Sequence, residues 1–464
     1  MNQISNRTFD EIQIGDSATL IRTATLQDIA LFAATSGDIN PAHMDADFAA
    51  GERFGQVVVH GMWTASLISA LLGNELPGPG TVYLGQDMRF KRPVRPGDII
   101  TARISVREKR EDKKVVVFDC LCSDADGRPV LTGSAEVIAP TVKHELNRTE
   151  MPEVQVNRHR IFDLGMKRAY LLPPLRAAVV QPTSERSITA AVEASDDRLF
   201  VPVLVGPRGR IEAAAKSAGV SIDGIELIDV PHSHAAALKA AQMAGAGEVD
   251  ALMKGSLHTD ELLSAVVARD NGLRTDRWLS HVFLFDVPAY DKLLIVTDGA
   301  INIAPTLEQK RDIAQNAIDL ARTLGVREPK VAVLAAVETV NPKMASTLDA
   351  AALTVMAARG QIEHGLVDGP LAFDNAIDMD AVREKGIESR VAGQADILLA
   401  PDLEAGNIAA KQLMYFARAD SAGLVLGAKV PIILTSRADS VRTRLASIAL
   451  ARIVAHTKTA EGAA

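Results

Sequence analysis

The pattern of apolar residues changes near residue 160, and one ordinary fold does not accommodate both patterns. Up to about residue 140, a short helical run at 26–35 and a long apolar helical stretch at 59–76 precede four strand-like runs. Those runs lie at 81–90, 99–108, 114–123 and 129–138, with turn residues between them. A helix followed by an antiparallel meander predicts an α+β domain in which a sheet wraps one helix.

After residue 160, short strand-like runs alternate with alanine-rich helical runs. The strand-like runs lie at 200–205, 225–230, 251–254, 293–297, 331–335, 397–400 and 431–435. The helical runs between them include 307–324, 347–359 and 407–417. This order predicts mostly parallel sheets with helices on both faces, and ligands at the carboxyl ends of the strands. Because roughly 300 residues exceed one ordinary core, we expect a two-lobed α/β module.

The length of 464 residues also favours two or three domains. Residues 141–160 are mostly polar and have no clear period, so they predict a linker. We therefore expect one domain at 1–140 and a second module at 161–464. The net charge of −8 argues against a general nucleic-acid binder.

Several broad classes are excluded by simple features of the chain. The N-terminal residues lack the apolar core of a signal peptide, and no apolar run is long enough to span a bilayer. Cys120 and Cys122 are the only cysteines. They would share one face of a strand, where a disulfide between them would be strained. We therefore expect a cytoplasmic protein with two reduced thiols, bound neither to a membrane nor to a structural metal.

One short segment carries groups suited to acid–base chemistry. The run Ser36-Gly37-Asp38-Ile39-Asn40-Pro41-Ala42-His43 places a carboxylate and an imidazole on either side of Asn-Pro. Proline bars a regular helix there and favours a tight turn. Asp and His on one turn can exchange protons with water. Asp-x-Asn-Pro alone is also a common structural turn, and a histidine such as His60 is often only a packed side chain.

This turn belongs to a longer series of segments. It is followed by His60-Gly61-Met62, by the run 71–80 and by Tyr83-Leu84-Gly85-Gln86. Together the segments resemble the MaoC-like, (R)-specific enoyl-CoA hydratases, which have the hot-dog fold. The resemblance covers only the first third of the chain. Hot-dog thioesterases share the fold and the acyl-CoA ligand, and the turn with both Asp and His favours the hydratase over them.

The resemblance assigns a role to five residues. A hydratase needs a donor to the thioester oxygen, where enolate charge develops, and an acid–base pair for the water and the α-carbon. By the resemblance, Asp38 and His43 of this chain would form that acid–base pair, and Asn40 would shape the turn. The Gly61 N–H, free at a helix start, would donate to the thioester oxygen. Ser69 would orient the aspartate.

The C-terminal two-thirds resemble a different family. The matching segments are 297–302, 341–344, 367–377, 392–407 and 435–440. In this order they resemble the phosphate acetyltransferase/phosphate butyryltransferase family. The later segments look closer to the butyryl branch. The glycines form neither a dinucleotide fingerprint nor a P-loop, so no nucleotide site is expected.

The last of these segments suggests how phosphate would bind. A buried strand at 430–435 runs into Ser436-Arg437 and then a helix at 440–455. Free amides at the helix start, the Arg437 fork and the Ser436 hydroxyl would together hold phosphate beside a thioester. Read alone, the same Ser-Arg pair is often a helix cap and a solvated charge.

This chain departs from the family at the residue that serves as the general base. The resemblance implies an aspartate that deprotonates the coenzyme A thiol, and Thr443 occupies its place in an ungapped comparison. Asp439 is the nearest carboxylate, and we assign it the role of the base. The alternative is that Asp439 is only the N-cap of the last helix.

The sequence thus predicts a bifunctional enzyme of acyl-CoA metabolism. The first domain would hydrate a short trans-2-enoyl-CoA to an (R)-3-hydroxyacyl-CoA, and the second would move a short acyl group between coenzyme A and phosphate. Coenzyme A thioesters and phosphate are substrates, with no metal or redox cofactor. Both families usually pair, so we expect a homo-oligomer. In the alternative, only the hydratase is active and the C-terminal module is an acyl-CoA-binding, sensing or assembly domain.

Overall fold

The protein is described by a computed structural model that covers residues 3–147, 154, 160–434 and 440–462. The chain divides into two compact units, Met1–Val156 and Asn157–Ala464. Within the expected linker, residues 148–153 and 155–159 lie outside the described residues. The part before them contains β7 (Glu145–Asn147), which pairs antiparallel with β1 (Gln3–Ser5). The boundaries at 140 and 161 therefore stay a prediction.

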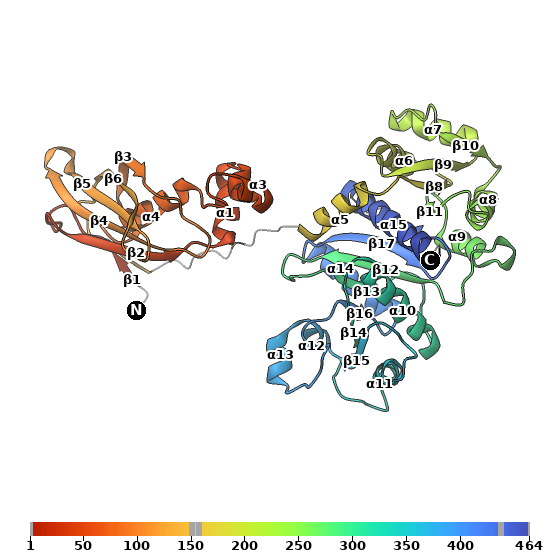
Figure 1. The fold of residues 1–464 in the computed structure, drawn as a ribbon. Coiled ribbons are helices and arrows are strands. Elements are labelled where there is room, and N and C mark those ends of the chain that lie inside the picture. Colours follow the sequence, from red (N-terminus) through yellow and green to blue (C-terminus); the bar gives the residue numbers. More distant parts are fainter. Residues whose placement is uncertain (1–2, 148–153, 155–159, 435–439, 463–464) are drawn as a thin grey trace. The chain divides into compact units, whose positions relative to one another are not determined.

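The described part of the N-terminal unit has a five-stranded sheet with the order β2-β4-β5-β6-β3, antiparallel throughout. Its strands are β2 (Ser17–Thr23), β3 (Val82–Phe90), β4 (Ile99–Arg110), β5 (Val115–Ser123) and β6 (Pro129–Ile138). The helices of this unit are α1 (Leu26–Ser36), α2 (Pro41–Met44), α3 (Ala46–Gly51) and α4 (Gly61–Asn74), with a 3-10 turn η1 (Asp112–Lys114). Figure 1 shows α4 lying against the sheet.

Helix α4 forms the centre of this unit because apolar side chains surround most of it. Ile68 and Leu71 are fully buried, and Trp63 and Leu67 are nearly so. In β4, buried and more exposed residues alternate, as expected for a sheet with one covered face. The α+β arrangement predicted from the sequence, one helix wrapped by an antiparallel sheet, is confirmed.

Both cysteines lie on the covered face of β5. Cys120 and Cys122 are buried and free, and they face the core that contains α4. Burial raises the pKa of each thiol to about 12. The expected pair of reduced thiols on one face is therefore present, and both thiols are poor nucleophiles near neutral pH.

The C-terminal unit is built on one large sheet. Its strands are β8 (Leu175–Val180), β9 (Phe200–Gly206), β10 (Glu226–Asp229), β11 (Ala251–Lys254), β12 (Ser280–Asp286), β13 (Leu294–Thr297), β14 (Lys330–Leu334), β15 (Leu366–Leu371), β16 (Ile397–Leu399), β17 (Asp420–Leu426) and β18 (Ile432–Ile433). Among the described residues these strands form one eleven-stranded sheet, with the order β10-β9-β8-β11-β18-β17-β12-β13-β16-β14-β15. Most neighbours are parallel, as predicted, but β12 and β17 run antiparallel at the centre. The two expected lobes thus share a continuous sheet.

Helices cover both faces of this sheet (Figure 1). They are α5 (Arg160–Tyr170), α6 (Glu185–Asp196), α7 (Arg208–Ala218), α8 (Ser233–Gly245), α9 (Thr259–Val267), α10 (Leu307–Thr323), α11 (Ala345–Ala358), α12 (Phe373–Ile377), α13 (Met379–Glu384), α14 (Leu403–Tyr415) and α15 (Val441–Gly462), with a 3-10 turn η2 (Arg269–Asn271). One face packs α5–α7, α10, α11 and α15 in a single core. The other face packs α8 and α9 at one end and α12–α14 at the other.

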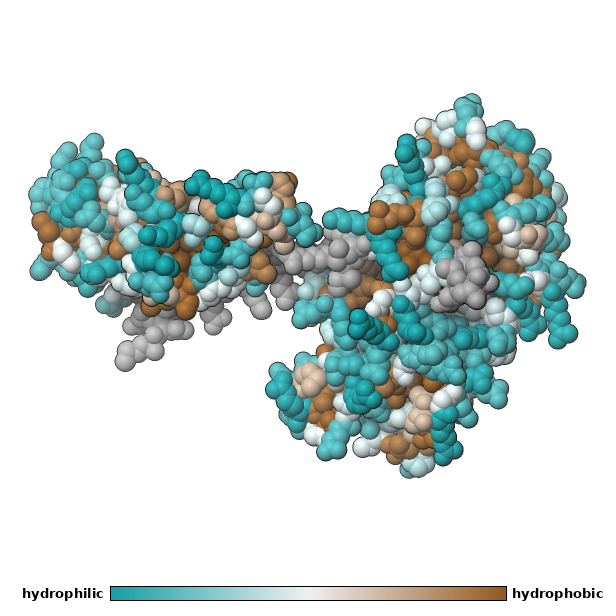
Figure 2. Space-filling view, in the orientation of Figure 1, coloured by the Kyte–Doolittle hydropathy of each residue, from teal (hydrophilic) through white to brown (hydrophobic). Residues whose placement is uncertain are grey.

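The surface is largely hydrophilic on the face drawn in Figure 2, where teal residues cover most of both units. Within the described residues, every helix is too short or too polar to cross a membrane.

A buried polar pair stands at the centre of the large sheet. The Asp298 carboxylate follows β13 and accepts backbone N–H groups of Ala300 (2.8 Å), Ile301 (3.0 Å) and Asn302 (3.3 Å). It also accepts the backbone N–H of His281, at 3.2 Å. The His281 ring is buried, and its Nδ1 has no partner among the described residues. Burial lowers the pKa of His281 to about 4, and the Asp298 charge only partly opposes this.

We predict a pH-dependent loss of stability from His281. Its folded-state pKa lies below its ordinary value of 6.5. The unfolded chain therefore binds more protons between those values, and stability falls as the pH drops from 6.5 toward 4, by up to about 1.4 kcal/mol per unit. His281→Gln removes this term. Thermal unfolding of both proteins from pH 7 to 4.5 checks it: the wild type should lose more stability than the variant, and parallel profiles would contradict the prediction.

Candidate functional site

The predicted acid–base turn is held by its own side chains. Helix α1 ends at Gly37, which adopts a left-handed conformation with φ of 74° and redirects the chain. The Asp38 N–H then donates to Ser36 Oγ at 3.2 Å, and the Asn40 N–H donates to Asp38 Oδ1 at 3.2 Å. Asn40 Oδ1 accepts the Ala42 N–H at 3.1 Å and caps the short helix α2. These contacts give Asn40 the geometry of a turn-shaping residue.

Two histidine rings meet beside this turn, and each has one nitrogen on a carbonyl. His43 Nδ1 lies 2.6 Å from the carbonyl oxygen of Val58, and His60 Nε2 lies 3.0 Å from that of Asp38. A carbonyl only accepts, so the proton of His43 is on Nδ1 and that of His60 on Nε2. Each ring keeps one lone pair, on His43 Nε2 and His60 Nδ1. The ring centroids are 4.0 Å apart.

The Asp38 carboxylate completes a compact group. One ligand-type atom from each of Asp38, His43 and His60 lies within 4.8 Å of the other two. Asp38 is exposed, His43 is half-buried, and His60 is 1% exposed. By donor type the same atoms could hold a metal ion, whereas the acid–base interpretation also accounts for the open helix start described next. A site without metal stays a prediction.

Helix α4 begins at this group. Gly61 is its first residue, and His60 occupies the N-cap position without a side-chain hydrogen bond to the helix. The first amides of a helix have no partner within it, so they can receive an oxyanion. A Cβ at Gly61 would come within 3.1 Å of the Phe90 ring. Glycine therefore keeps space between the amide and Phe90 that a side chain would fill.

Ser69 lies elsewhere on the helix. It is exposed and follows Gly61 by eight residues, which corresponds to about 12 Å along the helix axis. Asp38 is held at the other end, because its carbonyl accepts from His60. No hydrogen bond joins Ser69 to Asp38 among the described residues. The structure therefore brings Asp38, His43 and Gly61 together but leaves Ser69 apart from them.

His60 is the residue whose position the sequence did not reveal. Its place immediately before a glycine and a long apolar helix was the available signal, because an N-cap residue is fixed by the helix that follows. The fold buries its ring against His43 and Phe32. It therefore contacts both proposed acid–base groups.

Ser436, Arg437 and Asp439 lie outside the described residues, between β18 and α15. Beyond them, Ser440 Oγ accepts the Thr443 N–H at 3.1 Å, which is the pattern of an N-cap. The capping role considered for Asp439 is thus filled by Ser440. Thr443 also places its hydroxyl 3.0 Å from Ser440 Oγ.

Two of the segments that suggested a transferase pack together. Asn407 Nδ2, near the start of α14, donates to the carbonyl of Gly299 at 2.9 Å. A Cβ at Gly406 would lie 2.2 Å from the Asp298 carbonyl oxygen, so only glycine fits there. These segments follow β13 and β16, which are parallel neighbours. They form a close-packed loop pair at the carboxyl ends of two strands.

Comparison with known proteins identifies both parts of the chain. A model described as MaoC like domain matches residues 13–120, and one described as Phosphate acetyl/butaryl transferase matches 232–452. The phosphate acetyltransferase of Rhizobium meliloti is 55% identical over 294 residues, covering 63% of this chain and 93% of that protein.

Solved structures resemble each part. A branched-chain phosphotransacylase from Enterococcus faecalis V583 is 29% identical with a TM-score of 0.53, covering 60% of this chain and 99% of that chain. The unliganded R-hydratase PhaJ1 from Pseudomonas aeruginosa is 39% identical with a TM-score of 0.32, covering 33% of this chain and 99% of that one. The chain therefore belongs, through its C-terminal unit, to the phosphate acetyl/butyryltransferase family of enzymes, and its N-terminal unit is a MaoC-like domain.

Proposed function

We propose that the N-terminal domain hydrates a short trans-2-enoyl-CoA to an (R)-3-hydroxyacyl-CoA, and that the C-terminal module transfers a short acyl group between coenzyme A and phosphate. One observation carries the hydratase proposal. The Val58 carbonyl holds the proton of His43 on Nδ1, which leaves Nε2 to act as a base, and His43 is grouped with Asp38 and with His60, the residue that precedes α4. The MaoC-like match supports the same substrate class.

The hydration step follows from this arrangement. The thioester oxygen accepts the Gly61 N–H, so the charge that develops on it in the enolate meets the positive end of α4. Water lies between Asp38 and His43 and gives one proton to this pair as its oxygen bonds to the β-carbon. The pair returns a proton to the α-carbon. The sum is addition of H and OH across the double bond, with no change in the enzyme.

The transfer step relies on residues of the strand–helix turn. Arg437 and Ser436 hold phosphate, and a phosphate oxygen attacks the thioester carbonyl carbon directly. The carbon–sulfur bond breaks, coenzyme A leaves as thiolate, and an acyl phosphate forms. In the reverse direction Asp439 takes the thiol proton. The family match and the 55% identical acetyltransferase support this chemistry.

We also propose that the chain forms a homo-oligomer. β3 is an edge strand of the five-stranded sheet, and its apolar residues Val82, Tyr83, Leu84 and Phe90 are all at least 40% exposed. An apolar edge of this kind suits pairing with a second copy. Acyl-CoA, enoyl-CoA and phosphate are the small-molecule partners.

Two alternative functions would give different results in one assay of thiol release. If the C-terminal module only binds or senses acyl-CoA, butyryl-CoA with phosphate releases no free thiol. If the N-terminal domain is a thioesterase, thiol appears from acyl-CoA without phosphate. The proposed function requires thiol release that depends on phosphate, together with hydration of crotonyl-CoA that does not.

Asp38→Asn tests the acid–base pair and the independence of the two sites. Loss of the carboxylate should lower hydration of crotonyl-CoA by about 10²–10⁴-fold, the usual worth of acid–base catalysis. Phosphate-dependent thiol release from butyryl-CoA should stay near the wild-type rate. Loss of both activities in a protein with an unchanged melting temperature would contradict separate sites.

His60 is proposed as a positioning residue for Asp38. In His60→Gln the side-chain amide can still donate where Nε2 does, whereas in His60→Asn the shorter amide cannot reach the Asp38 carbonyl. We expect His60→Gln to retain most of the turnover and His60→Asn to lose about 100-fold in kcat with a smaller change in KM. Equal losses in the two variants would show that His60 only fills space.

Arg437→Lys tests the phosphate site. Lysine keeps the charge but lacks the planar fork. We expect the KM for phosphate to rise about tenfold, the worth of one charge-assisted hydrogen bond, with hydration of crotonyl-CoA unchanged. Steady-state kinetics with varied phosphate measure this. An unaltered KM at unaltered turnover would place Arg437 away from phosphate.

A further inference from the structure

A polar cleft of about 960 Å³ lies in the C-terminal unit. Its walls come from α10, from the loop before β12, from the turn after β17 and from the last part of α15. Residues of these four walls include Asp319, Arg277, Gly427 and Thr457. The volume is within the range of pockets that enclose a small molecule.

The cleft is separate from the proposed phosphate site. Ser436 and Arg437, the residues proposed for that site, precede α15 in the sequence, and α15 begins at Val441. The cleft is lined by Val454 and Thr457, which are 13 and 16 residues further along the same helix. At 1.5 Å per residue these positions are about 20–24 Å from the helix start. Contact with phosphate at Ser436 and Arg437 therefore does not account for the cleft.

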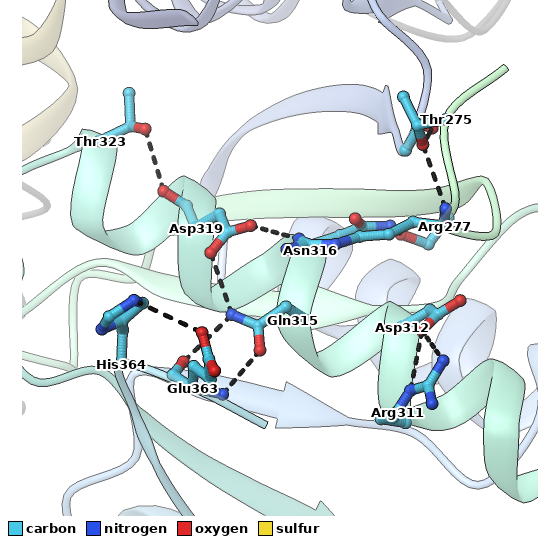
Figure 3. A network of polar contacts seen from close by, with 12 residues as sticks. Thr275, Arg277, Arg311, Asp312, Gln315, Asn316, Asp319, Thr323, Glu363 and His364 are labelled. Carbon is cyan, nitrogen blue, oxygen red and sulfur yellow. Dashed lines mark hydrogen bonds and ion pairs between the residues drawn. The ribbon is translucent and has the colours of Figure 1, made fainter. Parts of the chain in front are cut away.

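Four of the residues that line the cleft belong to one hydrogen-bonded network (Figure 3). Asp319 on α10 pairs with Arg277 and accepts Gln315 Nε2 at 3.0 Å. Gln315 also donates to the Glu363 carbonyl at 3.1 Å and accepts the Glu363 N–H at 2.7 Å. The Asp319 charge is balanced by Arg277, so this network is close to neutral.

The rim carries guanidinium groups that lack carboxylate partners. Arg322 and Arg327 are exposed, and their guanidinium groups make no ion pair or hydrogen bond among the described residues. Arg168 donates to the Thr323 carbonyl at 3.1 Å and pairs with no carboxylate in the same part of the chain. Two further acids, Asp276 and Glu363, line the cleft, and the Glu363 carboxylate is 3.8 Å from His364 Nε2.

The contribution of arginine to the stability of α10 accounts for only part of the positive charge that lines the cleft. Arg322 is in the last turn of α10, where a cation complements the helix dipole. Arg327 lies beyond the end of that helix, and the neighbouring acid, Glu328, pairs with Arg390 instead. A local excess of unpaired arginine in a chain of net charge −8 is suited to an anionic ligand.

The same cleft has an apolar portion. Leu320, Val326, Leu426 and Val454 contribute to its lining. A ligand that uses both parts carries phosphate at the guanidinium rim and a flat or apolar group against these side chains. We propose that this cleft is a second binding site, for a nucleoside diphosphate-like anion, distinct from the hydration site of the N-terminal unit and from the proposed phosphate-binding residues Ser436 and Arg437. The anion that binds there is either a free nucleotide or the nucleotide portion of coenzyme A.

The test uses the full chain and ADP as the probe, at 150 mM NaCl, by calorimetry. Adenosine and pyrophosphate are titrated separately to resolve the two parts of the cleft. The test variant is Arg322→Gln/Arg327→Gln. The matched control is Arg359→Gln/Arg418→Gln, which removes two other exposed arginines of the same unit whose guanidinium groups make no ion pair or hydrogen bond among the described residues and do not line the cleft. Melting temperature and butyryl-CoA turnover verify the fold of each variant.

We expect ADP to bind the wild type and the control equally, and the test variant at least about tenfold more weakly. Adenosine and pyrophosphate should each bind more weakly than ADP. Competition by coenzyme A that persists in Arg437→Lys would identify coenzyme A as the source, and its absence would identify a free nucleotide. No ADP binding at millimolar concentration, or equal weakening in test and control variants, would overturn the proposal.

Discussion

The burial of α4 is the constraint on which the N-terminal site depends. Full burial of a side chain such as Ile68 or Leu71 contributes about 1.5–3 kcal/mol, so the helix is held firmly against the sheet. Its first residue, Gly61, is thereby fixed, and so is the buried ring of His60 before it. That ring holds the Asp38 carbonyl and contacts His43. Packing in the core thus sets the position of polar groups at the surface.

The C-terminal unit relates packing to chemistry in a similar way. Parallel strands bring loops from distant parts of the sequence to one edge of the sheet. The loop after β13 is fixed by the Asp298 carboxylate and meets the start of α14 through Asn407. Helix α15 begins at Val441, shortly after the residues predicted to bind phosphate, and it lines the polar cleft at Val454 and Thr457. The N-terminal unit has a core of its own.

Much of the fold follows from local sequence, and the exceptions have physical causes. The runs at 99–108 and 129–138 become β4 and β6 because their alternation matches a sheet with one covered face. β12 and β17 were not predicted, because a fully buried central strand lacks alternation.

The residues of the N-terminal site divide in the same way, into those placed by local sequence and those placed by tertiary packing. The Asp38–His43 turn is local and could be predicted. The contact of His60 with that turn depends on tertiary packing, and no spacing reveals it. The distance of Ser69 from Asp38 likewise follows from where α4 lies in the fold.

The central claim is that one chain carries two separate acyl-CoA chemistries. The most direct measurement follows enoyl absorbance and free thiol together, with purified full-length protein and a mixture of crotonyl-CoA and butyryl-CoA, first without phosphate and then with it. The account predicts loss of the enoyl signal without thiol release, an (R)-3-hydroxybutyryl-CoA product, and thiol release only after phosphate is added. Thiol release before phosphate, or an enoyl signal that does not change, would contradict it.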